Sequence, residues 1–476
     1  MALLIVLAIV VGAAPLVWAK PVRGIYILFA AAVTIEIFPL GFSDSLTDQL
    51  PFFLNLNNSG IAGLSITPAE ILMVIALISW WANYAANRHE NLRPQGRILT
   101  AYVVYLVVVL FAEVRGLLSG ANLNISLWEL RPQVYGFILF LLTASLIRER
   151  RQLLTLAGIF LAGTGLKAVL GFNRYVFTLN HDLGSNDSIL GHEASYFLLL
   201  FLVAVVCILI WYRRRSLVLA ALLMTPIVTF VLFENRRRAG VLALGVALIV
   251  VVALGIRFER TVQVRLAIIS AVAAVFLVIF FGANWNKQDG LVGQVVRPVH
   301  SMFQPDDRDF SSNLYRQNEN ANLTYSFNQN RLFGVGFGSP MPIIFPLADI
   351  SQSYPLWQYI PHNTLLWIGM RMGLIGFAAF FALVGMTILE GVRQVATRDD
   401  ALLRGIAVFA LAAVIAELMV AYGDVQLENY RNMIFTGTLI GLIDAIPQIA
   451  HAPVAAVAWT RTELLRQHRL APDAVV

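Results

Sequence analysis

Residues 266–282 read LAIISAVAAVFLVIFFG, an apolar run without a single charged residue. As a helix, this run is long enough to cross most of a hydrocarbon core, which is roughly 30 Å thick. Similar runs recur along the whole sequence. Hydrophobic residues make up 58% of the 476 residues and charged residues only 13%, whereas soluble domains carry about 25% charge. The sequence therefore predicts an all-α, polytopic transmembrane bundle.

About thirteen such runs predict membrane spans, and twelve is the alternative count because the first run is short. The first run also lacks a preceding basic segment and a clear cleavage site, so we interpret it as a retained helix rather than a signal peptide. The predicted spans are Leu3–Trp18, Gly24–Leu40, Pro68–Trp81, Ile98–Leu117, Val134–Ile147, Leu153–Leu170, Ser195–Trp211, Leu217–Leu232, Gly240–Ile256, Leu266–Gly282, Thr364–Leu389, Gly405–Tyr422 and Met433–Ile446.

Basic residues concentrate in alternate loops between these spans, for example Arg148 to Arg151 and Arg213 to Arg215. The positive-inside rule assigns such loops to the cytoplasm. The opposite loops are poor in basic residues, and residues 41–67 contain none. The N-terminus is therefore predicted to lie outside and the tail, residues 451–476, inside. The net charge of +6 reflects these loops and gives no reason to expect nucleic acid as a partner.

One long hydrophilic insertion, residues 283–361, separates the spans within residues 1–282 from those within residues 362–450. Insertions of this length in compact architectures are usually functional or disordered. Its aromatic residues and Gly-rich stretch argue against plain disorder. The alternation of basic loops puts the insertion outside, so we expect a large extracytoplasmic loop.

Three consecutive arginines, Arg236–Arg238, stand at another predicted outer junction, where the charge rule disfavours them. Bringing arginine into the bilayer costs about 2.5–3.5 kcal/mol at a helix centre and less near the interface. One interpretation is that these side chains reach lipid headgroups. The other is that they bind phosphate, because guanidinium groups stay charged and can contact phosphate in a bidentate manner.

Two histidines stand at predicted outer entrances of helices. His192 lies in GHEAS, residues 191–195, and His362 lies in PHNT, residues 361–364. Imidazole is well suited to proton transfer near neutral pH. Taken alone, each histidine can equally be a solvated or helix-capping residue.

The segments PHNTLL, residues 361–366, and GLIG, residues 373–376, together resemble the H-N-x-x-L…G-L-I-G pattern of the bacterial O-antigen ligase and O-antigen polymerase family. The stretch RLFGVGFG, residues 331–338, resembles the family's P-x-F-G-x-G-x-G motif, with Arg331 near the usual proline. Arg316 matches an arginine expected before that motif.

Two further segments fit the same family. The tripeptide RAG, residues 238–240, resembles the S-R-G-A motif at a helix start, although Arg237 stands in the place of the serine. GHEA, residues 191–194, is a loose match to an N-P-N-x-x-A-like motif. All the motifs occur in the family's order and on the predicted outer side. The detailed resemblance covers roughly residues 171–376, and the remainder resembles the family only as a helical bundle.

The resemblance implies a C-type glycosyltransferase-like protein of the bacterial inner membrane, with its active site extracytoplasmic. The implied donor is an undecaprenyl-diphosphate-linked glycan, and the implied reaction is an inverting displacement that needs no metal or other cofactor. In that reaction His362 is the base on the acceptor hydroxyl, and Arg238 stabilises the leaving diphosphate. The implied substrate contacts are Arg236, Arg316, Arg174 and His192.

Other features leave alternatives open. Asp307-Arg308-Asp309 reads as D-x-D, a spacing at which two carboxylates can hold a divalent cation on phosphate oxygens. Lys167 and Arg371 fall inside predicted spans, where ionisable residues are functional candidates by default. Arg371 either faces the same outer cavity as His362 or pairs with an acidic neighbour such as Glu417.

Three functional classes fit the sequence. The first is the membrane glycosyltransferase, whose acceptor is a glycan, lipid or protein for a ligase and another lipid-linked repeat for a polymerase. The second is a flippase-like transporter of lipid-linked glycans, which would favour discontinuous helices near the midplane and have little use for a long outer loop. The third is a non-catalytic scaffold. The residues alone favour the enzyme but do not separate ligase from polymerase.

Overall fold

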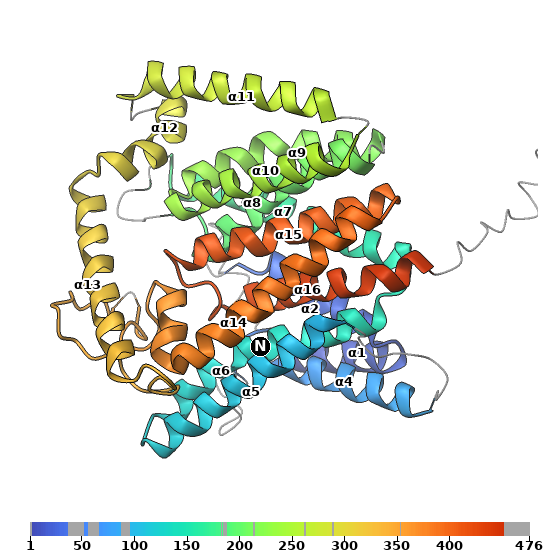
Figure 1. Cartoon of the computed structure of the whole chain (residues 1–476), viewed down its shortest axis with the longest axis vertical. Coiled ribbons are helices and arrows are strands. Elements are labelled where there is room, and N and C mark those ends of the chain that lie inside the picture. Colours follow the sequence, from blue (N-terminus) through green and yellow to red (C-terminus); the bar gives the residue numbers. More distant parts are fainter. Residues whose placement is uncertain are drawn as a thin grey trace, which may run out of the picture.

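A computed structural model describes residues 2–36, 52–55, 66–86, 96–181, 183, 188–212, 215–260, 263–287, 290–352 and 354–451. All secondary-structure elements in these ranges are helices. They form one bundle in which most helices run side by side (Figure 1). Residues 452–476 of the predicted tail, and most of residues 41–67, lie outside the described ranges.

The helices are α1 (Ala2–Ala19), α2 (Val22–Thr34), α4 (Pro68–Ala86), α5 (Arg97–Leu118), α6 (Leu123–Leu146), α7 (Arg150–Asn173), the π-helix η2 (Arg174–Thr178), α8 (His192–Cys207), the π-helix η3 (Ile208–Tyr212), α9 (Arg215–Glu234), α10 (Arg238–Phe258), α11 (Gln263–Asn284), α12 (Gly290–Phe303), α13 (Asp307–Gln329), α14 (Thr364–Thr397), α15 (Ala401–Ala421) and α16 (Tyr430–His451).

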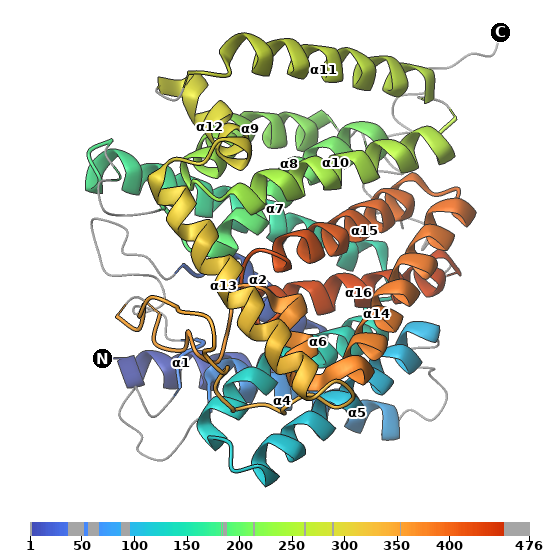
Figure 2. The same cartoon turned by 60° about the vertical axis from the view of Figure 1, so that its left-hand side comes forward.

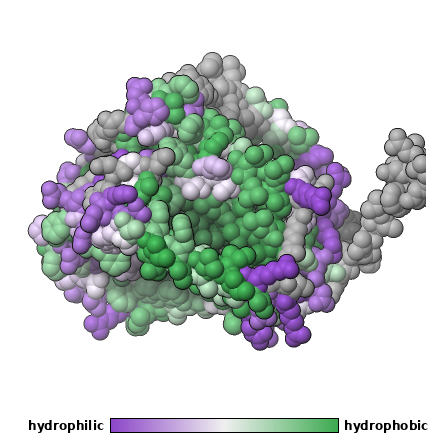
Figure 3. Space-filling model, turned by 90° about the horizontal axis from the view of Figure 1, so that it is seen from above, coloured by the Kyte–Doolittle hydropathy of each residue, from purple (hydrophilic) through white to green (hydrophobic). Residues whose placement is uncertain are grey.

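Twelve of the thirteen predicted spans each fall on one helix over nearly all of their described residues, and Ser195–Trp211 runs from α8 into η3. Ile35 and Glu36 of the span Gly24–Leu40 lie beyond the end of α2. Ten helices in the described ranges are long and apolar enough to cross a membrane, namely α4, α5, α7 to α11 and α14 to α16. The other three are the shorter apolar helices α1 and α2, and α6, whose first turns carry Glu129 and Arg131. Seen from above, an apolar surface separates two polar ends (Figure 3). The prediction of an all-α polytopic bundle is confirmed.

The core is centred on α16, which packs against α6, α2, α14 and α15. Its side chains Ile434, Phe435 and Ile443 are completely buried. A side chain at Gly437 would collide with the backbone of Gly136 in α6, so the two helices approach backbone to backbone. Such contacts through small residues are typical of helices packed within membranes, where backbones approach closely without a hydrophobic driving force.

The insertion between α11 and α14 contains two helices and an irregular segment, rather than only the loop that the sequence predicted. The second helix, α13, begins where the Asp306 carboxylate accepts a hydrogen bond from the Asp309 N–H at 2.7 Å, which caps the first turn. From there α13 lies across one end of the bundle and reaches α14 (Figures 1 and 2). This end of the bundle is called the α13 end below.

The helix α14 is interrupted at Gly373, whose φ of 64° lies in the left-handed region. The Gly-rich stretch 331–338 fills this interruption. The N–H of Leu374 donates to the carbonyl of Arg331, and the N–H of Val335 donates to the carbonyl of Met370. The segments 331–338 and 370–376, which carry the resemblance noted in the sequence, therefore pack directly on each other.

A buried ion pair holds this junction together. Arg371 in α14 and Glu129 in α6 are both fully buried, with 2.6 Å between Nη2 and Oε1. The partner of Arg371 is thus Glu129 and not Glu417, and the guanidinium does not face an outer cavity. The carboxylate of Glu129 also accepts from the Trp367 indole N–H and the Gly338 N–H. The guanidinium of Arg371 also donates to the carbonyls of Gly336, Ser339 and Tyr359.

Candidate active site

The first element of the candidate site is His362, directly before α14. Asn363 caps this helix by accepting a hydrogen bond from the Leu366 N–H at 3.1 Å. Glu319, a buried residue of α13, binds His362 twice: one oxygen accepts the backbone N–H at 2.9 Å, and the other lies 3.1 Å from the imidazole Nδ1. The rings of Tyr315 and Tyr354 pack beside the imidazole. Because Glu319 contacts Nδ1, the imidazole Nε2 is the ring nitrogen that can contact a substrate.

The second element is a pair formed by His192 and Asp424. α8 begins at His192, and the imidazole Nδ1 lies 3.1 Å from the Asp424 carboxylate, in the turn between α15 and α16. Asp424 is buried, and burial alone would raise the pKa of its carboxyl. The charges of His192, Arg237 and Arg316 more than offset this effect and hold the pKa of Asp424 well below its usual range. Asp424 thus gathers cationic side chains from α8, from the N-cap of α10 and from α13.

The arginines of the run 236–238 point in different directions. Arg237 stands at the N-cap position of α10 and interacts electrostatically with Asp424, and its guanidinium donates to the Ser188 hydroxyl at 3.4 Å. Arg238 points instead toward α13, where it donates to the Asn313 carbonyl oxygen at 2.8 Å and lies 3.9 Å from Asp309. Arg236 adopts a positive φ of 53° in the turn and interacts with Glu234.

A third polar pair lies beside the other two. The Thr364 hydroxyl, in the first turn of α14, donates to the Glu428 carboxylate at 2.7 Å. The same hydroxyl lies 3.4 Å from the Asp424 carbonyl, so the His362 and Asp424 groups are neighbours. Burial raises the pKa of Glu428 to about 8. A neutral carboxylic acid therefore stands beside the ionised Asp424 at neutral pH.

Arg174 stands apart from this group. It is buried at the end of α7, donates to the Ile189 carbonyl at 2.5 Å and interacts with Glu36. Glu36 also pairs with Lys167 at 3.2 Å, both side chains being fully buried. Arg174 and Lys167 thus belong to an ionic network inside the bundle, and their contacts resemble structural pairing more than substrate binding.

Asp307 and Asp309 lie in the first turn of α13, where acidic residues favour a helix N-terminus. Within the described residues, no group of three or more histidine, cysteine, aspartate or glutamate side chains could hold a metal ion.

The structure brings His362, His192 and Arg316 to one region and adds residues that the sequence reasoning missed: Glu319, Asp424, Glu428 and Arg237. The acidic residues carried a usable signal. Asp424 and Glu428 lie in a predicted outer segment close to a helix end, where they can face a histidine, and Glu319 lies within the predicted outer insertion. Arg237 was within the quoted motif but was treated only as the substitute for a serine.

A comparison with known protein families finds one match, and the matched region contains several of these residues. Residues 227–381 match the family model described as O-antigen ligase. The match includes Arg236–Arg238, Arg316, Glu319 and His362, whereas His192, Asp424 and Glu428 lie outside it. No curated protein matches the sequence.

Proposed function

We propose that this chain is a multi-pass membrane glycosyltransferase of the O-antigen ligase and polymerase type, since residues 227–381 match the O-antigen ligase family model and ten of its described helices are long and apolar enough to cross a membrane. In this proposal it transfers a glycan from an undecaprenyl-diphosphate donor to an acceptor hydroxyl at the α13 end. The observation that carries the proposal is the His362–Glu319 pair beside the cationic group around Asp424.

In the proposed reaction, the acceptor oxygen attacks the anomeric carbon from the face opposite the diphosphate. His362 takes the proton of the attacking hydroxyl while the new carbon–oxygen bond forms. The bond between the anomeric carbon and the diphosphate oxygen breaks, and its electron pair leaves with the diphosphate. Glu319 supports this role because a carboxylate at Nδ1 holds the imidazole in one orientation and stabilises its protonated form.

The leaving diphosphate gains negative charge as the bond breaks, so cations preorganised at that position lower the barrier. We assign this role to Arg316 and to the run Arg236–Arg238, with His192 as a further contact. Arg316 and Arg237 are supported by their electrostatic interaction with Asp424, the carboxylate that also contacts His192. Arg174 is the weakest member of the proposed set, because its contacts lie with Ile189 and Glu36.

Reconstitution of the purified chain with a labelled lipid-linked repeat as the only substrate tests the proposal. Chain growth under these conditions identifies a polymerase. Transfer that requires a second acceptor identifies a ligase. If the label moves across the membrane of a vesicle without any new glycosidic bond, the protein is a transporter and the proposed reaction is wrong.

The interrupted helix α14 is the observation closest to a transporter. In transporters, such interruptions expose backbone groups to a substrate near the midplane. Here residues 331–336 form backbone hydrogen bonds with the interrupted part of α14. The backbone groups at the interruption are therefore not available to a transported substrate. This pairing favours the enzyme.

The proposed reaction also requires that the α13 end face away from the cytoplasm. The basic loops support this orientation, since they lie at the other end of the bundle. A reporter fused at Asn320 should therefore read external, and a reporter fused after Arg151 should read cytoplasmic. A cytoplasmic signal at Asn320 would contradict the proposed side of the reaction.

A further inference from the structure

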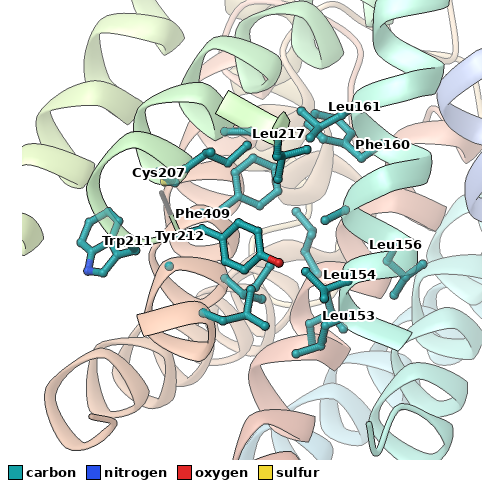
Figure 4. Close-up of a pocket in the computed structure, with 18 of the residues that line it drawn as sticks. Leu153, Leu154, Leu156, Phe160, Leu161, Cys207, Trp211, Tyr212, Leu217 and Phe409 are labelled. Carbon is teal, nitrogen blue, oxygen red and sulfur yellow. The ribbon is translucent and has the colours of Figure 1, made fainter. Parts of the chain in front are cut away.

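A cavity lies between α7, α15 and the end of α8, at the end of the bundle opposite His192 and Asp424. Its walls are formed almost entirely by apolar side chains, among them Leu154, Ala157, Cys207, Trp211 and Phe409. It has a volume of about 80 Å³ and is open on one side. Figure 4 shows these residues, and the ring of Tyr212 extends among them with its hydroxyl directed toward the α7 side. A cavity lined by apolar side chains suits a hydrocarbon ligand better than water.

The wall at η3 is unusual. Ile208–Tyr212 form a π-helix, a rare conformation that occurs frequently at functional sites. This segment contributes Trp211 and Tyr212 to the lining. The cavity thus combines apolar walls with one phenol hydroxyl, and this combination suits a molecule that is mostly hydrocarbon but has a polar end.

Cationic side chains stand at the same end of the helices that line the cavity. Arg151 precedes Leu153 in α7, and Arg215 begins α9 just before the lining residue Leu217. Both arginines are exposed, and neither guanidinium has a carboxylate partner among the described residues. Arg150 differs, because it pairs with Asp400 at 2.6 Å. Among the described residues that begin α7 and α9, Arg151 and Arg215 therefore carry positive charge that no carboxylate offsets.

We propose that this cavity binds an acyl chain of an anionic membrane phospholipid, whose phosphate is bound by Arg151 and Arg215. Basic residues beside a pocket between membrane helices are typical of sites for anionic headgroups. The chain would lie against Phe160 and Phe409, with the Trp211 indole behind the cavity wall toward Gly255, and the Tyr212 hydroxyl would meet the polar region of the lipid. Since α8 and α15 line the cavity and extend to His192 and Asp424, an occupied cavity stabilises the two helices that support the candidate site.

The proposal can be tested without any glycan substrate. The full chain is placed in nanodiscs of phosphatidylcholine that contain phosphatidylglycerol with brominated acyl chains, which quench nearby tryptophan. The contribution of Trp211 is the difference in fluorescence between the wild type and Trp211→Phe. We expect this contribution to be quenched in the wild type and protected in Ala157→Phe, which fills the cavity. Val272→Phe, on the exposed face of α11, is the matched control and should leave the quenching unchanged.

The headgroup is tested separately by native mass spectrometry of the purified chain, which also serves if Trp211→Phe does not fold. Retention of phosphatidylglycerol should fall about fivefold for each arginine removed in Arg151→Gln and Arg215→Gln. Arg331→Gln removes an exposed arginine from the insertion at the α13 end, and this variant should retain the lipid. If brominated phosphatidylcholine quenches Trp211 equally well and the arginine variants retain phosphatidylglycerol, the site is not specific for anionic lipid. An unquenched Trp211 would show that no acyl chain enters the cavity.

Discussion

Arg371 and Arg316 both belong to the α13 end, yet their surroundings are opposite. Arg371 is fully buried, pairs with Glu129 and donates to three backbone carbonyls, so its charge and its donors are used within the fold. Arg316 is half-buried, and its guanidinium has no hydrogen bond or ion pair with another described residue. Its electrostatic partner is Asp424, which it shares with His192 and Arg237.

This difference separates charges that hold the fold from charges that can bind a ligand. A buried ion must be compensated by the protein itself, because its desolvation costs several kcal/mol. A half-exposed guanidinium keeps its donors for an anion such as phosphate. Variants at the α13 end should therefore divide into two groups, one that loses activity while the fold persists and one that loses the fold.

The largest expected effect belongs to His362. Replacing it with alanine should lower turnover by about 10²–10⁴-fold, the usual contribution of a positioned general base. Thermal stability in detergent should change much less than in variants of Glu129. His181→Ala, an exposed histidine in a predicted outer segment, is the control and should keep full turnover.

The pH profile distinguishes a base from a cation at the same position. A base works when its imidazole is neutral, so wild-type transfer should rise between about pH 5 and pH 8. A cation that binds phosphate would lose its charge over this interval, and transfer would fall. A profile that falls with pH, or full activity in His362→Gln, would exclude His362 as the base.

The opposite group is tested at Glu129. Its replacement with alanine leaves Arg371 buried without a counter-ion, and we expect the free energy of unfolding to fall by about 3–5 kcal/mol. The control is Glu390→Ala in α14, the helix of Arg371, which breaks a pair whose Arg393 side chain is exposed and should cost less than about 1 kcal/mol. Equal melting temperatures for the two variants would contradict the division between the groups.

The sequence predicted the bundle well because each span is a long and mainly apolar run, and the run at residues 266–282 has no charged residue at all. It predicted the entrance at His362 because the histidine precedes such a run directly. Pairings between distant segments carry no comparable local signal. Nothing in the sequence near Arg371 indicates that its partner is Glu129, which lies 242 positions away in the chain. By sequence alone, Glu417 is an equally reasonable partner. The same limitation hid Glu319 and Asp424, which become recognisable only once α13 and the α15–α16 turn are placed beside the histidines.

Arg316 should show a smaller loss than His362. Its replacement with alanine removes one preorganised donor to the leaving group, an effect of about 10²–10³-fold on turnover. Arg316→Lys should recover only part of it, because an ammonium cannot present the planar fork of a guanidinium. Arg331→Ala removes an exposed arginine from the same insertion and is the control for a general loss of positive charge. If Arg316→Ala binds and transfers the donor as the wild type does, the half-buried guanidinium of Arg316 does not contribute to donor binding or to the reaction.

The smallest and most discriminating effect concerns neighbouring arginines of one run. The motif resemblance assigns the diphosphate to Arg238, but its guanidinium binds Asn313 and approaches Asp309 on α13. Arg237 instead faces Asp424 together with Arg316. We therefore expect Arg237→Ala to lose more transfer activity than Arg238→Ala, and Arg238→Lys to retain most of it, since a lysine can still bind Asn313. The measurement is the initial rate of transfer at saturating and at low donor concentration for each variant. A larger loss in Arg238→Ala that is confined to donor binding would show that Arg238 binds the phosphate. The role of Arg237 would then be to stabilise the turn before α10.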